Sequence, residues 1–592
     1  MRDGEDNEAQ DPKQKAGSEE RREENSLIVQ HSALQKRKTE EPMQTRSDLW
    51  AQGLIVAACL GLGLWAAERF WPRALPIVEN AILPCVSYAP FRYPDHSPFD
   101  PRLRIDRASL RADLAQIRSL SPCLRTYGLD HGMDQLPDIA REMGLRLRLG
   151  LWLGQDPVAN RREIEQAVDL ASAYPDVVEQ VIVGNEVLLR GDLSPEALAD
   201  ILAEMQQRVD LPITYADVWE FWRRHAAVLR PHVDSVAVHI LPYWEDDPIA
   251  VDQAVEYLYA RYAEMQALFA PLPVWVGETG WPARGRSRGG AVPGVYEQAF
   301  FVHSLLHKHQ SEPMPFNLIE AFDQPWKRVQ EGAMGGAWGV FDSGGHQRVD
   351  WRRPGSGAVA NGVTLAGLAG LFGFGLLLRW RERHAAGGVN SPRRLRSEVW
   401  FVTLLILGLL AAQLEMAWIW SRSAGEWATA LLQIGVTSLL SLVLAAQILS
   451  RRSGAPDCPS CPPGLLPWLV GLWLVLVLIT AHGLVFDGRY RAFAWPLLLG
   501  PVVLGAAAIL RGVTRPWHRP PIRWMAYLAG LAGLVVVYQE GLENRQALGY
   551  GALLVCVTAL VVLAARIPPR EASGEGVGPA DDQASSRISG KL

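Results

Sequence analysis

VIVGNEVLL (residues 181–189) and LPVWVGETGWP (residues 272–282) are two apolar, β-branched runs that each carry one glutamate, Glu186 in the first and Glu278 in the second. A continuous apolar run is typical of a strand buried on both faces of a parallel sheet. In a barrel of alternating strands and helices, residues at the carboxyl end of a strand point into the active-site mouth. The two runs therefore predict two carboxylates in one mouth, which is the minimum needed to cut a glycosidic bond.

The segment from residue 80 to residue 353 alternates short apolar runs with amphipathic stretches, which predicts repeated strand–helix units and a parallel sheet. About eight such runs in about 270 residues match the size of a (β/α)8 barrel, so the expected fold class is α/β, a TIM barrel. Helices are expected at 107–120, 194–209 and 250–269, with Ser194 as an N-cap before Pro195. The eight runs are residues 82–91, 123–128, 145–154, 181–189, 211–217, 233–244, 272–281 and 315–323.

Segments suited to a membrane flank this barrel on both sides. Residues 48–70 contain an apolar stretch long enough to span a bilayer, which predicts an uncleaved anchor rather than a cleaved signal peptide. Residues 357–566 hold apolar blocks that predict a membrane domain of about seven helices. The polar segments 1–47 and 567–592 are expected to be disordered. The seven blocks are residues 359–378, 399–420, 427–449, 465–486, 492–510, 522–538 and 546–565.

Arginines in the connecting loops predict the orientation of these helices. They are concentrated after the first, third, fifth and last of the seven blocks and are sparse in the alternate loops. By the positive-inside rule the arginine-rich loops are cytoplasmic. Both termini are then cytoplasmic, and the barrel lies outside the cytoplasm.

Composition excludes some classes and leaves others open. The net charge of −5 does not suggest a nucleic-acid binder. Six cysteines are too few for a disulfide scaffold. Cys85 and Cys123 begin adjacent predicted strands and come within disulfide reach, but two buried thiols are the favoured interpretation.

Acetal cleavage assigns different roles to the two glutamates. One carboxylic acid protonates the leaving oxygen and a carboxylate acts on the other side of the anomeric carbon, so we assign Glu186 as acid/base and Glu278 as nucleophile. Asn185 is suited to hold a sugar hydroxyl, whereas His239 is interpreted as a hydrogen-bonded structural residue. No metal or cofactor is expected. Aromatic residues at the ends of predicted strands are candidates for stacking on sugar rings, namely Tyr88, Phe91, Tyr127, Tyr243, Trp244, Trp281, Trp326 and Trp338.

The segments VIVGNEV, VHILPYW, VWVGETGWP, FDQPWK and WGVFD resemble motifs of the glycoside hydrolase family 17 β-1,3-glucanase clan. The resemblance implies a retaining (β/α)8 enzyme with Glu186 as acid/base and Glu278 as nucleophile. It also implies that Asn185, Tyr243 and Trp281 line sugar subsites, and it adds Asp323 and Lys327 as candidates. Plant members carry an acidic residue in a F-D-E-N-x-K run, where this chain has FDQPWK at 322–327, so a secondary carboxylate there is in doubt.

The whole layout resembles bacterial inner-membrane proteins linked to β-glucan synthesis. It implies a multi-pass protein of the inner membrane that works beside a separate β-glucan synthase. The expected function is a membrane-bound β-1,3-glucan glucanosyltransferase that makes or remodels β-glucan, branched or cyclic products included. Endo-β-1,3-glucan hydrolysis is the first alternative, and a non-catalytic glucan-binding component of an export complex is the second.

Overall fold

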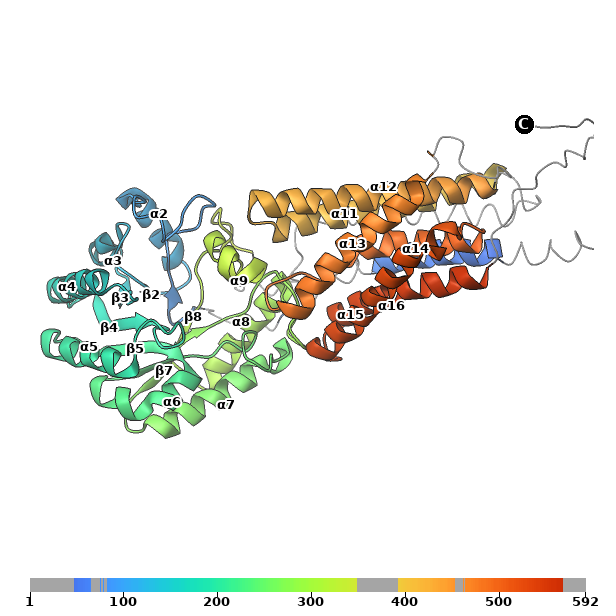
Figure 1. Cartoon of the computed structure of the whole chain (residues 1–592). Coiled ribbons are helices and arrows are strands. Elements are labelled where there is room, and N and C mark those ends of the chain that lie inside the picture. The colour runs from blue at the N-terminus through green and yellow to red at the C-terminus, as the bar shows by residue number, and fades with distance from the viewer. Residues whose placement is uncertain are drawn as a thin grey trace, which may run out of the picture.

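The described part of the chain forms two bodies joined end to end, a barrel and a bundle of helices (Figure 1). The computed structural model describes residues 47–64, 75, 78, 82–348, 392–452, 462 and 464–567. Apart from Ser47 and Ile567, the two tails that we expected to be disordered lie outside the described residues, as does the apolar block at 359–378.

Within residues 82–348, eight parallel strands close into a barrel in chain order, with Leu318 of the last strand pairing with Val86 of the first. This confirms the predicted TIM barrel. The strands are β1 (Val86–Ser87), β2 (Cys123–Arg125), β3 (Arg146–Leu151), β4 (Val178–Asn185), β5 (Ile213–Val218), β6 (Val236–His239), β7 (Val274–Thr279) and β8 (Phe316–Leu318). The helices are α2 (Arg107–Arg118), α3 (Leu136–Met143), α4 (Pro157–Ala173), α5 (Pro195–Arg208), α6 (Trp219–Leu229), α7 (Val251–Phe269), α8 (Val295–Ser311) and α9 (Arg328–Gly335). Short 3₁₀ turns stand at Met133–Gln135, Arg230–His232 and Pro325–Lys327.

The sequence pattern explains these elements. Strand β7 is buried along its whole length, as its continuous apolar run predicts. Helix α2 buries Leu110, Leu114 and Ile117, which share one face at helical spacing. The predicted N-cap of α5 is confirmed, because the Ser194 side chain accepts a hydrogen bond from the backbone N–H of Ala197 at 3.2 Å.

Cys85 and Cys123 form a disulfide with a Cα–Cα distance of 4.6 Å, so the favoured interpretation of two buried thiols was wrong. The strand register explains the bond. Val86 of β1 pairs with Leu124 of β2, which places the residue before each of them side by side. Disulfides form and persist mainly in oxidising compartments.

Cys85→Ser is expected to lower the free energy of unfolding of the barrel by about 3–4 kcal/mol, because the bond closes a loop with a sequence separation of 38 residues. Thermal unfolding of the full chain in detergent measures the change. Cys556→Ser is the control, since Cys556 is an exposed free thiol of the bundle and its loss should leave stability unchanged. Equal stability of the two variants would show that Cys85 is not bridged.

The bundle is built from long apolar helices. Within the described residues, six helices are long and apolar enough to cross a membrane, the first of them at Ser47–Leu64. Helix α14 has only 15 residues, about 22 Å, and is shorter than the full span expected at 492–510 because residues 488–495 form a loop instead. The labelled helices are α11 (Pro392–Trp420), α12 (Ala424–Arg452), α13 (Leu465–Phe486), α14 (Pro496–Leu510), α15 (Pro520–Glu540) and α16 (Arg545–Arg566), and a 3₁₀ turn stands at Arg515–His518.

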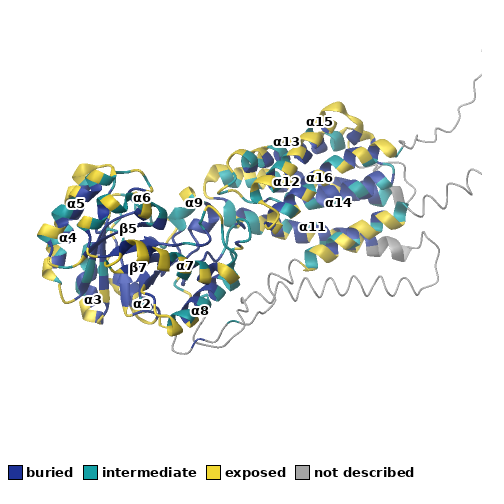
Figure 2. Cartoon of the chain, turned by 90° about the horizontal axis from the view of Figure 1, so that it is seen from below, coloured by how far each residue is buried: buried dark blue, intermediate teal, exposed yellow. Residues whose placement is uncertain are grey.

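Figure 2 shows exposed positions along the helices of the bundle, and many of the exposed residues are large and apolar. Exposed aromatic residues stand near both ends of the long helices, for example Trp468 and Phe486 on α13 and Trp524 and Tyr538 on α15. Trp468 and Phe486 are 18 positions apart, or about 27 Å along a helix, which is close to the thickness of a bilayer core. Aromatic side chains at this spacing are typical of the two interfaces of a membrane.

Loops at the carboxyl end of the barrel contact one end of the bundle, and we call this contact the junction. The buried Arg286, in the loop after β7, forms an ion pair with Glu540 of α15 and donates to the backbone oxygen of Gly488. Asn544 donates to the backbone oxygen of Ser287 at 3.0 Å. The junction therefore places the mouth of the barrel next to the helix ends.

Candidate active site

Glu186 follows the last residue of β4 in an uncommon backbone conformation, with φ of 51°. Non-glycine residues in this region cost about 1–3 kcal/mol and are held by their surroundings. The backbone N–H of Glu186 donates to the backbone oxygen of Ala216 at 2.8 Å. The pairing of β4 with β5 changes register from Ile182 to Asn185. This irregularity at the strand end turns the Glu186 side chain toward the mouth.

A buried group on β5 holds the turn that follows Glu186. The hydroxyl of Tyr215 accepts from the backbone N–H of Leu188 at 3.0 Å and donates to Asp217. Burial, with the charge of Glu186 as a smaller contribution, raises the pKa of Asp217 to about 6, against hydrogen bonds that lower it. Tyr215 and Asp217 are therefore positioning residues for Glu186.

Glu278 on β7 is buried and lies across the mouth from Glu186. The guanidinium of Arg125, which is fully buried at the end of β2, donates to Glu278 and to the side-chain oxygen of Asn185. A single arginine thus ties β2 to both β4 and β7. The hydrogen bond from Arg125 fixes the Asn185 side chain beside the two glutamates.

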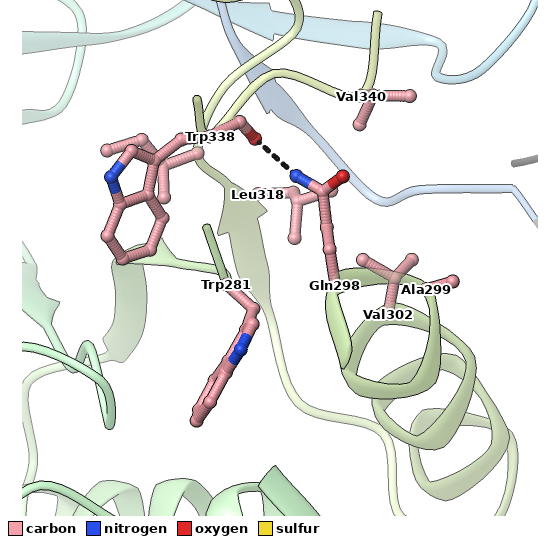
Figure 3. A pocket seen from close by; sticks show the side chains of 8 residues that line it. Trp281, Gln298, Ala299, Val302, Leu318, Trp338 and Val340 are labelled. Atoms are coloured by element: carbon pink, nitrogen blue, oxygen red, sulfur yellow. Dashed lines mark hydrogen bonds between the residues drawn. The ribbon is translucent and has the colours of Figure 1, made fainter. Parts of the chain in front are cut away.

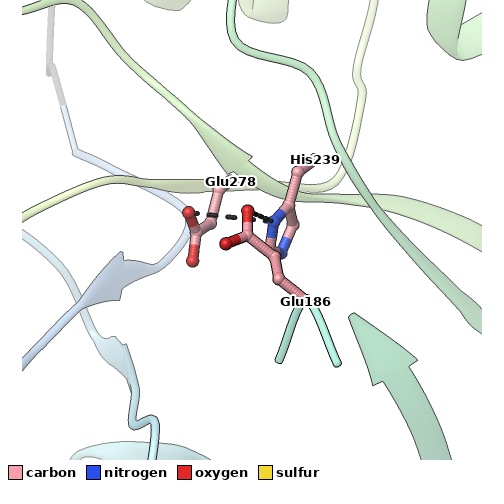
Figure 4. Close-up of side chains that lie close together, drawn as sticks. All are labelled: Glu186, His239 and Glu278. Carbon is pink, nitrogen blue, oxygen red and sulfur yellow. Dashed lines mark hydrogen bonds and ion pairs between the residues drawn. The ribbon is translucent and has the colours of Figure 1, made fainter. Parts of the chain in front are cut away.

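His239, at the end of β6, lies close to the carboxylates of both glutamates (Figure 4). Its Nδ1 is 3.1 Å from Oε1 of Glu186 and 3.8 Å from Oε2 of Glu278. Gly277 makes room for the ring, because a Cβ at that position would lie 2.9 Å from Cδ2 of His239. The prediction of a hydrogen-bonded histidine agrees with these contacts, and its hydrogen-bond partner is Glu186, the predicted acid/base.

The charges around Glu278 keep its carboxylate ionised. Burial alone would raise the pKa of Glu278, but the charges of His239, Arg125 and Lys327 outweigh burial and lower it to about 2. An ionised carboxylate at neutral pH is what a nucleophile needs. The electrostatics therefore fit Glu278 to that role.

A second group of charges lies on the segment after β8. Lys327 forms an ion pair with the buried Glu320, and burial raises the pKa of Glu320 to about 7. Burial also raises the pKa of Glu331 on α9, and the charges of Glu186 and Glu278 add to this effect. The partner of Lys327 is thus a glutamate upstream of the 322–327 run, where the sequence left a secondary carboxylate in doubt.

One donor atom each from Glu186, His239 and Glu278 lies within 4.8 Å of the other two, a spacing that could hold a cation. Arg125 and Lys327 already bring two positive charges to Glu278, which opposes a third.

The predicted aromatic and polar site residues fall into two groups. Tyr127 is half-buried, with its ring centroid 4.2 Å from the guanidinium carbon of Arg125 and 5.9 Å from Nζ of Lys327. Its hydroxyl oxygen is buried and has no hydrogen-bond partner among the described residues, so its contact with substrate stays a prediction. Lys327 lies beside Tyr127, but its ammonium group is paired with Glu320.

The other predicted residues are engaged inside the protein, and their contact with substrate stays a prediction. The hydroxyl of Tyr88 donates to Asp113 at 2.8 Å, and that of Tyr243 donates to the backbone oxygen of Arg286 at 2.7 Å. Asp323 accepts from Arg348 and from the backbone N–H of Gly339.

Trp281 and Trp338 line a small, mostly apolar pocket between β8 and α8 (Figure 3). Trp281 Nε1 donates to the backbone oxygen of Val292 at 2.9 Å. Gln298 of α8 donates to the backbone oxygen of Trp338 at 3.0 Å, as the figure shows. Both indoles are almost fully buried, so packing is the role that their contacts support.

Comparisons with known proteins concern the barrel. Residues 85–339 match the model of the BtgE/BtgC glycoside hydrolase domain. A probable β-glucosidase btgE of Aspergillus fumigatus is 25% identical over 245 residues, covering 40% of this chain and 42% of the relative. A probable glucan endo-1,3-β-glucosidase btgC of the same fungus is 24% identical over 302 residues, covering 45% and 42%.

Among solved structures, a glycoside hydrolase family 17 β-1,3-glucanosyltransferase from Rhizomucor miehei is 22% identical, with a TM-score of 0.40. The match covers 46% of this chain and 97% of that one. The chain spans less than half the length of the two curated relatives described above.

Proposed function

We propose that the chain is a membrane-bound retaining β-1,3-glucan glucanosyltransferase, because residues 85–339 match the model of the BtgE/BtgC glycoside hydrolase domain. It acts outside the cytoplasm in the synthesis or remodelling of β-glucan. The substrate class rests on the resemblance of the strand-end motifs and on the names of the relatives, one of which is a probable glucan endo-1,3-β-glucosidase.

The separation of the two glutamates carries the proposal of a retaining mechanism. One carboxylate oxygen of Glu186 lies within 4.8 Å of one oxygen of Glu278. Retaining enzymes place their two carboxyl groups about 5–5.5 Å apart, whereas inverting enzymes leave about 6.5–9.5 Å for a water molecule. The short separation in this barrel favours direct attack by Glu278.

The reaction then runs in two displacements. Glu278 attacks the anomeric carbon and forms a glycosyl ester, while Glu186 gives its proton to the departing sugar oxygen. In the second step an acceptor hydroxyl attacks the same carbon, Glu186 takes the proton of that hydroxyl, and Glu278 leaves as a carboxylate. A sugar acceptor gives a longer chain, and water gives hydrolysis.

The membrane setting supports transfer as the main outcome. Six helices of spanning length and exposed aromatic residues at both helix ends support insertion in a bilayer. The carboxyl ends of α12, α14 and α16, where arginines occur in the sequence, lie at the end of the bundle away from the barrel (Figure 1), which supports a barrel outside the cytoplasm. Glucan emerging from a separate synthase in the same membrane would then supply acceptor ends at high local concentration.

Product analysis of the full chain in nanodiscs with laminaripentaose tests this proposal. Oligosaccharides longer than the substrate, whose share rises with substrate concentration, are the expected result. Shorter products alone at every concentration would establish a hydrolase instead. Unchanged substrate that nevertheless binds would indicate a glucan-binding module. Glu278→Gln serves as the blank, because it removes the nucleophile and preserves the shape of the site.

A further inference from the structure

The loop between α13 and α14, residues 487–495, reaches from the bundle to the mouth of the barrel. Tyr490 in this loop packs on Trp244, which follows β6, with ring centroids 6.0 Å apart and planes at 71°. Its backbone oxygen lies against Gly332 of α9, where an added Cβ would come within 3.0 Å of it. Tyr490 also packs against the hydrophobic core of the barrel. The loop therefore packs directly on the barrel, beside Trp244 and Gly332.

Arg489 in the same loop is an exposed cation beside two aromatic rings. Its guanidinium carbon is 5.6 Å from the ring centroid of Trp244 and 5.8 Å from that of Tyr490. The guanidinium carbon of Arg288, in the loop after β7, is 5.2 Å from the ring centroid of Trp244. Burial lowers the pKa of Arg288, and the like charge of Arg489 adds to the effect. An ion pair for Arg489 is absent from the residues that the structure describes, so its donors are free for a ligand.

This aromatic and cationic group, which we call the junction platform (Trp244, Arg288, Arg489 and Tyr490), adjoins the catalytic centre. Gly332, which touches Tyr490, directly follows Glu331, a residue within electrostatic range of both Glu186 and Glu278. Trp244 directly follows Tyr243, and its ring stacks near that of Trp338 at 6.3 Å and 22°. A glucan chain that leaves the mouth on this side would pass over the platform.

We propose that the junction platform is a glucose-binding subsite of the enzyme, outside the cleavage point, to which the membrane domain contributes Arg489 and Tyr490. Part-exposed aromatic rings offer an apolar face to the C–H groups of a β-linked glucose, and a guanidinium offers five N–H donors to its hydroxyls. The identity of the ligand as β-glucan rests on the proposed function. The bundle thereby selects long glucan chains as well as anchoring the barrel.

Direct binding to an inactive full-length protein tests the subsite. In a Glu278→Gln background, calorimetry compares laminaribiose with laminariheptaose before and after Arg489→Gln and Tyr490→Ala. We expect each variant to raise the Kd for the heptaose about tenfold and to change the Kd for the biose by less than about twofold. Arg224→Ala is the matched control, because Arg224 makes a similar contact, 5.0 Å from the Phe221 ring, on the outer helix α6.

Other outcomes overturn the subsite. An unchanged Kd for the heptaose, or equal weakening for both ligands, would show that the platform does not bind sugar. A lower Tm together with equal weakening would identify the platform as interdomain packing. If Arg489→Gln binds vesicles that contain anionic lipid less well than the parent protein does, while its Kd for the heptaose is unchanged, Arg489 binds a lipid headgroup instead. The binding measurement needs no turnover. If the wild-type chain were inactive, the proposed function would be wrong, whereas the heptaose Kd of the Arg489 and Tyr490 variants would still decide whether the platform binds sugar.

Discussion

Glu278→Gln is expected to lower kcat for both transfer and hydrolysis by at least about 10⁴-fold. Glutamine keeps the shape of the side chain but cannot attack the anomeric carbon. The measurement is product formation from laminaripentaose by the full chain. Glu179→Gln is the control, since Glu179 is a partly exposed glutamate near the start of β4 that pairs with Arg146. It should retain activity within about twofold, as surface pairs contribute little.

Azide distinguishes the roles of the two glutamates. With an aryl β-laminaribioside whose leaving group needs no proton, Glu186→Gly still forms the glycosyl-enzyme on Glu278. Azide then attacks from the opposite side and should give the β-glycosyl azide. In Glu278→Gly, azide replaces the nucleophile itself and should give the α-glycosyl azide. Exchange of the two products would mean that the assigned roles are reversed, whatever the fall in kcat.

The parts of the fold predicted from the sequence are those that depend on local pattern. The runs around Glu186 and Glu278 are buried on both faces, so they read as continuous apolar strands, and their carboxyl ends must meet in a closed barrel. The disulfide is a feature that local sequence pattern does not predict. Each cysteine was placed at the start of a strand, but their pairing depends on the register of Val86 with Leu124.

Charged residues of the centre were harder to find. Arg125 was not predicted, although an arginine inside the apolar run CLRTYG is itself a signal, because arginine is seldom fully buried without a partner. Its partners Asn185 and Glu278 are 60 and 153 positions away, and only barrel closure brings them together. The φ of Glu186 likewise depends on the bulge between β4 and β5.

The aromatic residues show a further limit. Tyr88 and Trp281 follow the ends of β1 and β7 closely and Tyr243 lies in the loop after β6, yet their polar atoms bind groups inside the protein. A strand-end position alone does not tell whether a ring faces the mouth or packs behind it. Tyr490 was not predicted at all, because its place beside Trp244 depends on how the bundle meets the barrel.

Arg125→Met is expected to move the acid limb of kcat/KM upward by about 1–3 pH units, which is the effect of one adjacent opposite charge on a carboxyl group. In the native protein the pKa of Glu278 is lowered to about 2 against the effect of burial, with Arg125 among the causes, so the nucleophile stays ionised in mild acid. Without Arg125, burial is opposed by His239 and Lys327 alone, and Glu278 takes up a proton at higher pH. The pH profile between about 3 and 8 measures the shift.

The same variant has a matched effect on stability. Because the pKa of Glu278 in the folded protein is below its unfolded value of about 4.3, ionised Glu278 stabilises the fold above that pH and the contribution is lost as pH falls toward 2. Removing one partner of a buried pair costs about 3–5 kcal/mol, so Arg125→Met should unfold more easily at neutral pH.

Arg148→Met separates the two effects. Arg148 is the register partner of Arg125 on β3, but its guanidinium lies over Trp275 and does not bind Glu278. This variant can lose stability, but its acid limb should not move. If both arginine variants show the same pH profile, the ionisation of Glu278 does not depend on Arg125, and the acid limb reports another group. If only Arg125→Met shifts, the buried guanidinium keeps the nucleophile charged.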